Sequence, residues 1–69
     1  MTIKEIKQAI EDGKKVYQHN LGYEVILDSI GQYLIHCNMH NTYIGLHGVK
    51  GGKYENQLNG NESDFFIVE

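Results

Sequence analysis

The stretch TIKEIKQAIEDG, residues 2–13, carries the clearest structural signal in the chain. Thr2 and Glu5 have the S/T-x-x-E spacing of a capping box, in which the threonine hydroxyl accepts the N3 backbone N–H and the glutamate accepts the N–H of the cap residue. Gly13 is suited to the left-handed position that follows a helix C-terminus. The stretch therefore predicts a helix that begins after Thr2 and ends just before Gly13.

One face of this predicted helix is apolar. Its members are spaced at intervals of three, four and seven residues: Ile3, Ile6, Ala9 and Ile10. Such spacing places them in one stripe along the helix. About ten residues are too few to stay helical alone in water, so the stripe must pack against the rest of the chain.

After Gly13 the apolar pattern changes from helical to alternating, which is typical of strands. The predicted strands are Lys15–Asn20, Leu21–Ser29, Tyr33–Asn38, Tyr43–Leu46 and Phe65–Val68. The predicted turns are Asn20–Gly22, Asp28–Gln32 and Met39–Thr42, and a long loop rich in Gly and Asn separates Leu46 from Phe65. That loop is expected to be either functional or mobile.

The order of these elements predicts a single α+β domain over residues 1–69. An N-terminal helix packs on a small antiparallel β-meander of about five strands, because short turns join strands that are consecutive in the sequence. A roll or an SH3-like barrel would satisfy this order.

The composition limits the cellular compartments and the classes of partner that are expected for this protein. The chain is 41% hydrophobic and 22% charged, which is ordinary for a globular domain. With one cysteine it can form no internal disulfide, and no apolar run approaches the roughly 20 residues that span a bilayer. We therefore expect a soluble cytoplasmic protein without membrane contact. The net charge of −3 disfavours nucleic acid, whose phosphates attract strongly basic domains.

The segment HCNMHN, residues 36–41, raises the question of a metal site. Cys37 and His40 have the spacing of a zinc ligand pair, and His19, His36 or His47 could supply further ligands. However, His36 and Cys37 are neighbours on a predicted strand and so point to opposite faces. We expect Cys37 to be a small buried side chain and predict no cofactor, while a metal-binding or redox role of Cys37 stays an alternative.

No catalytic set is recognisable. Cys37 lacks a signature turn with a base, and the carboxylates Glu62 and Asp64 fit a turn that leads into the last strand. The glycine-rich stretch 45–52 does not end in the Gly-Lys-Ser/Thr of a phosphate loop. The sequence therefore predicts that the protein is not an enzyme.

Tyrosines fall at or near several strand starts and could align across the sheet. One interpretation places them in the core with their hydroxyl groups at its rim. The other is a partly exposed aromatic face flanked by lysines, suited to a protein partner or to stacked bases. The interaction residues predicted on this basis are Tyr17, Tyr33, Tyr43, Lys14, Lys15, Lys50 and Lys53.

The segments GKKVY, YEVI and GQYLI, followed by IGL and by LNG-x-E-x-DFF, together resemble a group of short uncharacterised proteins encoded by bacterial phages, prophages and plasmids. The resemblance runs from Gly13 to Phe66 and consists mainly of turn glycines and strand residues. It implies a mobile-element origin and no known activity.

The function predicted from these observations is a non-enzymatic protein-interaction module of mobile-element origin. Its partner would be another protein, either a host factor or a second copy of the chain, bound through a sheet edge or an aromatic patch. The first alternative is single-stranded nucleic-acid binding by lysine-flanked tyrosines. The second is the metal or redox role of Cys37.

Overall fold

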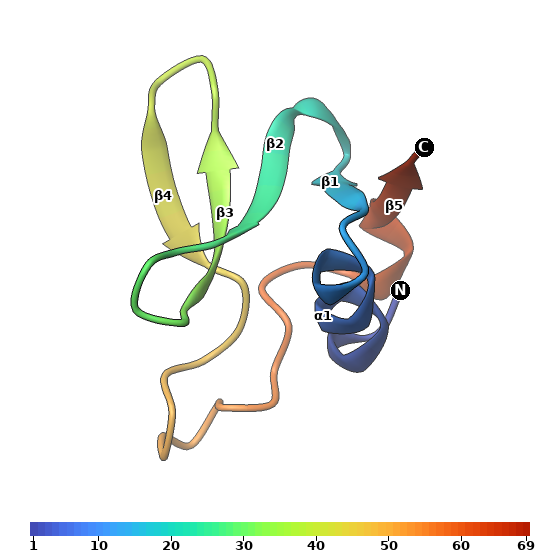
Figure 1. Ribbon diagram of the computed structural model, residues 1–69. Helices are drawn as coiled ribbons and strands as arrows, with labels where there is room; N and C mark the ends of the chain where they lie inside the picture. The colour runs from blue at the N-terminus through green and yellow to red at the C-terminus, as the bar shows by residue number, and fades with distance from the viewer.

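A computed structural model describes residues 1–69 and contains one α-helix, five strands and one short 3-10 helix. These elements are α1 Ile3–Glu11, β1 Lys15–Gln18, β2 Asn20–Leu27, β3 Tyr33–Cys37, β4 Thr42–Gly45, η1 Glu62–Asp64 and β5 Phe65–Val68. All strand pairs are antiparallel, in the order β4-β3-β2-β1-β5 (Figure 1). The predicted α+β architecture is confirmed. The edge strands β4 and β5 do not pair with each other, so the sheet is open and does not close into a barrel.

The N-terminus of α1 has the predicted capping box. The Glu5 N–H donates to Thr2 Oγ1 at 3.1 Å, and the Thr2 N–H donates to Glu5 Oε1 at 2.8 Å. Gly13 follows the C-cap with φ +82°, a conformation that costs glycine little. No helix of the structure is long and apolar enough to cross a membrane.

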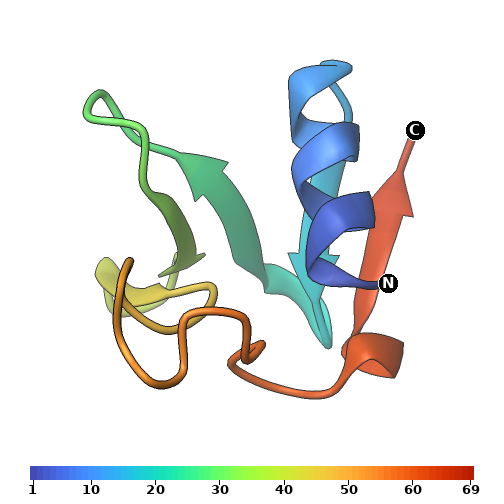
Figure 2. The same cartoon turned by 90° about the horizontal axis from the view of Figure 1, so that it is seen from below.

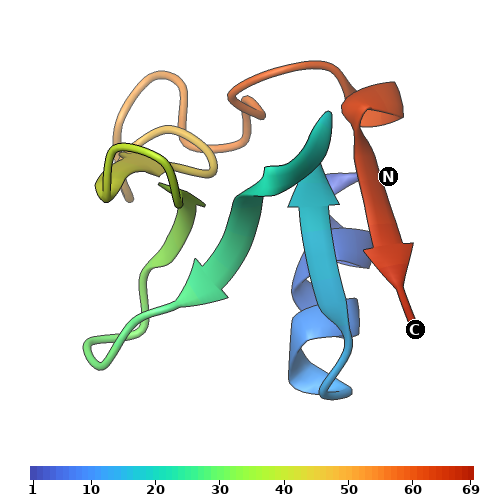
Figure 3. The ribbon, with the colours of Figure 1, turned by 90° about the horizontal axis from the view of Figure 1, so that it is seen from above.

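One face of the sheet is covered by α1, which lies over β1 and β5 (Figure 2). The buried apolar core consists of Ile6, Ala9, Val16, Val25, Ile35, Leu46 and Phe65. We call the α1 side of the sheet the inner face. Seen from the opposite direction, β5, β1 and β2 lie in front of α1 with no helix or loop over them (Figure 3). This uncovered side is called the outer face.

The reversal between β1 and β2 differs from the predicted turn at Asn20–Gly22. The chain turns at His19, which has φ +64°, and β2 already begins at Asn20. Gln18 pairs with Asn20 whereas Tyr17 pairs with Glu24, so the start of β2 contains extra residues and bulges. The His19 N–H donates to the Asp64 carbonyl at 2.8 Å. This distant partner stabilises a left-handed conformation that is uncommon for residues other than glycine.

The long segment after β4 folds back on the sheet. Leu46 is fully buried, and its carbonyl accepts the Asn59 N–H at 2.8 Å. The Asn59 side chain donates to the Gly45 carbonyl at 3.2 Å, and His47 forms an isolated antiparallel bridge with Leu58. Residues 58–59 therefore lie beside the end of β4. Residues 48–57 form a loop that leaves the sheet after His47 and returns to it at Leu58.

Candidate functional site

A row of side chains crosses the whole outer face. Because side chains alternate along strands and Val16 points into the core, Tyr17 points outward. Strand pairing then aligns one outward residue from every strand. In sheet order these residues, which we call the outer row, are Tyr43, His36, Glu24, Tyr17 and Phe66. The outer row runs across all five strands and so brings together residues that are far apart in the sequence.

At the β4 end of the outer row, two rings stack. The ring centroids of His36 and Tyr43 are 4.5 Å apart, with 15° between the ring planes. His36 Nε2 is also 2.9 Å from Asn41 Oδ1, in the turn that connects the two strands. Asn41 has φ +51°, which suits a tight turn. The imidazole is therefore held flat against the phenol ring, and Tyr43 as a whole remains 52% exposed.

At the β5 end, Tyr17 and Phe66 form the second aromatic pair. Their ring centroids are 6.0 Å apart and the planes differ by 28°, within the range of offset stacking. Phe66 is 36% exposed, while its neighbour Phe65 is buried in the core. Phe65 and Phe66 thus lie on opposite faces of the sheet.

The middle of the outer row carries charge. Glu24 is half-buried between the two aromatic pairs, one strand from Tyr17 and one strand from His36. Lys15 points to the same outer face, opposite Val68. A surface with an acidic centre, flanking aromatic rings and one nearby lysine can accept a partner's hydrogen-bond donors and apolar side chains.

The free edge of β4 adjoins this surface. The Leu46 N–H donates to the Tyr33 carbonyl at 3.0 Å, and antiparallel pairs alternate between bonded and non-bonded types. The His36–Tyr43 pair is therefore a non-bonded one, which brings its side chains close and directs the Tyr43 N–H and C=O away from β3. No backbone hydrogen bond from a turn or loop engages either group. β4 contains no proline or lysine, the residues that commonly prevent an edge strand from pairing with another chain.

The structure separates the interaction residues predicted from the sequence. Tyr17, Tyr43 and Lys15 lie on the outer face. Tyr33 lies on the inner face, where it packs against the core and the Lys7 ammonium sits 5.0 Å above its ring.

The other predicted lysines lie apart from the outer row. Lys14 Nζ is 3.9 Å from Glu69 Oε1, beyond the end of the sheet. Lys50 lines a cleft beside α1, and Lys53 sits over the Tyr54 ring at 5.6 Å. The tyrosines and lysines therefore do not form one patch.

Three members of the outer row were missed by sequence reasoning: Glu24, His36 and Phe66. Alternation gives their face but not their register. Only the strand pairing, including the bulge at the start of β2, shows that they align.

The histidines do not gather around Cys37. His36 points to the outer face, whereas Cys37 is buried on the inner side, opposite Tyr23. His47 Nδ1 is 2.8 Å from its neighbour's carbonyl, that of Gly48. No three histidine, cysteine or acidic side chains come together in a way that could hold a metal ion.

No known protein family, curated protein or solved structure matches the chain.

Proposed function

We propose that the protein is a non-enzymatic interaction module that binds another protein through the outer row and the adjoining β4 edge. The observation that carries this proposal is the row itself, which places four aromatic or imidazole rings on the side of the sheet that no helix covers. Contact surfaces of this kind are enriched in aromatic residues.

The β4 edge supports a specific mode of binding. An extended segment of the partner could pair with the free Tyr43 N–H and C=O, while its side chains contact the rings of the outer row. The usable edge is short, because Asn59 occupies the Gly45 carbonyl. Main-chain pairing at Tyr43 would therefore set the register, and side-chain contacts would supply most of the affinity.

A protein partner is favoured over single-stranded nucleic acid by the charges around the outer row. Glu24 lies at its centre and Lys15 is the only predicted lysine on the same face. A groove that tracks nucleic acid is expected to be positively charged along its length. The resemblance to phage, prophage and plasmid proteins is the basis for proposing a cytoplasmic host protein as the partner.

The test is site-specific photo-crosslinking in a bacterial lysate. A benzophenone amino acid in place of Tyr43 should yield one dominant protein adduct, whereas the same group in place of the exposed Tyr54 serves as control and should not. Adducts of equal yield from both positions, or none from position 43, would contradict the proposal.

Two variants at Tyr43 then separate the modes of contact. Tyr43→Val removes the ring but keeps the backbone N–H, whereas Tyr43→Pro removes both. Because that N–H points away from β3, proline there leaves the β3–β4 hydrogen bonds intact. Recovery of the partner should fall with Tyr43→Val and fall further with Tyr43→Pro. Equal recovery for the two variants would exclude strand pairing at β4.

A further inference from the structure

A second surface lies on the opposite side of the molecule, between α1, the β2–β3 turn and residues 47–56. It is a cleft of about 770 Å³, which we call the lysine cleft. Its apolar lining consists of Ile3, Ile30, Tyr33, Leu34 and Val49, and Lys7 and Lys50 supply its positive charge. This volume is within the range of ligand-binding clefts.

The charge of the lysine cleft is unusual for this chain. The protein has a net charge of −3, yet neither Lys7 nor Lys50 forms an ion pair. The cleft holds one carboxylate, that of Glu55, and its Oε2 already accepts the Gly51 N–H at 2.8 Å. With two lysines and one glutamate, the lysine cleft carries a formal charge of +1 in a chain whose net charge is −3.

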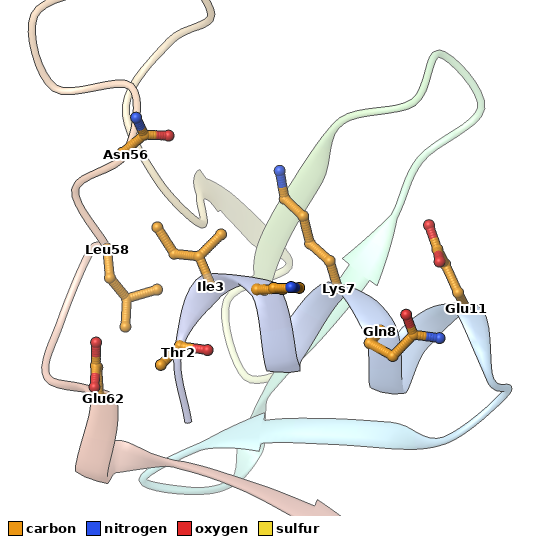
Figure 4. A pocket seen from close by; sticks show the side chains of 9 residues that line it. Thr2, Ile3, Lys7, Gln8, Glu11, Asn56, Leu58 and Glu62 are labelled. Atoms are coloured by element: carbon orange, nitrogen blue, oxygen red, sulfur yellow. The ribbon is translucent and has the colours of Figure 1, made fainter.

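The lysine cleft adjoins a neighbouring hollow. A second hollow of about 600 Å³ runs along α1 toward Thr2 and shares Ile3, Lys7 and Asn56 with it. In the close view of this hollow, Ile3 and Lys7 project from α1 while Asn56 and Leu58 lie on the segment across from them (Figure 4). Glu11 and Glu62 line this second hollow, so the acidic residues of a ligand are expected in the lysine cleft itself.

We infer that the lysine cleft binds a short acidic peptide segment of a partner protein, with carboxylates near Lys7 and Lys50 and an apolar side chain against Tyr33. The Lys7 ammonium lies 5.0 Å above the Tyr33 ring. A peptide that places an apolar side chain against Tyr33 would therefore bring the carboxylate of a neighbouring residue close to Lys7. This inference does not depend on the outer row, which lies on the other face of the sheet.

The test is titration of the 15N-labelled protein with the acetylated hexapeptide EELFEE, followed by amide chemical shifts. Saturable shifts are expected at Gly31 and Val49, which line the lysine cleft, and not at Glu24 or Tyr43. Affinity should weaken as salt is added, because exposed charges are screened. The peptide QQLFQQ, with both peptides also amidated at the C-terminus so that this control carries no charge, should bind at least about fivefold more weakly.

Matched variants assign the effect to the cleft. Lys7→Gln and Lys50→Gln should each weaken EELFEE binding by about threefold or more, whereas Lys15→Gln, the same change on the outer face, should not. Absence of saturable shifts at about 1 mM peptide, or equal binding of QQLFQQ, would overturn the inference. Saturable shifts at Gly31 and Val49 with an oligothymidine but not with EELFEE would also overturn it, in favour of a phosphate ligand.

Discussion

Replacing Ile6 by alanine should destabilise the protein by about 3 kcal/mol. Ile6 is fully buried and is the residue through which the apolar stripe of α1 enters the core. Truncation of a buried isoleucine to alanine typically costs about 2–5 kcal/mol, the sum of lost transfer free energy and an unfilled cavity. At about 0.05–0.15 kcal/mol per residue, a chain of this size has a total stability of roughly 3–10 kcal/mol. The variant should therefore lose about 30% or more of its stability.

Urea denaturation followed by far-UV circular dichroism measures this loss. Ile10→Ala is the matched control, because Ile10 lies on the same helix but is only partly buried against the core. Its cost should be about 1 kcal/mol. Equal free energies of unfolding for the two variants, both close to the parent, would refute the docking of α1 through Ile6. Ile6→Asp should remain unfolded at 25 °C, because it would bury an unpaired charge.

Three further perturbations test the cap, the inner face and the segment after β4. The hydrogen bond from the Thr2 backbone N–H lowers the pKa of Glu5 below its ordinary value of 4.5. The ionised Glu5 side chain therefore stabilises the fold fully above pH 4.5, and this stabilisation is lost as the pH falls through the lowered pKa. Glu5→Gln should accordingly lower the thermal midpoint at neutral pH, and the difference from the parent should vanish in acid. Cys37→Ala should cost about 1 kcal/mol in urea denaturation and be unaffected by a chelator, whereas a structural metal would make that loss large and chelator-sensitive. Gly48→Ala should speed amide exchange at Asn59, because its Cβ would lie 2.0 Å from the Tyr54 carbonyl oxygen and displace the segment, and unchanged exchange would contradict that packing.

The helix and the strands were predictable because their signals are local. The capping box at Thr2 and Glu5 and the alternation around Val25 and Ile35 need no distant partner to be recognised. The turn at His19 was not predictable, because histidine has no strong preference for positive φ. Its N–H is satisfied by Asp64, which lies far along the sequence.

The outer row shows the same division between local and distant information. The sequence indicates that Tyr17 and Tyr43 are on one face if their strands alternate. Their connection through Glu24 and His36 depends on a register that the bulge in β2 sets, and a shift of one residue would turn each side chain to the other face. The lysine cleft is harder still to predict, since Lys7 and Lys50 are brought together only by the way residues 47–56 fold back.

The pairing of the last strand with the first affects how the protein can be made. Phe65 contributes to the core and pairs with Gln18, so the hydrophobic centre stays incomplete until the segment that forms β5 has left the ribosome. Contacts between distant segments also require closure of a long loop, which slows folding. During synthesis, β1 to β4 would be present before β5, with one edge of β1 unpaired and the core lacking Phe65. This nascent stage is when a chaperone, or a second copy emerging from a neighbouring ribosome, could bind β1 in place of β5.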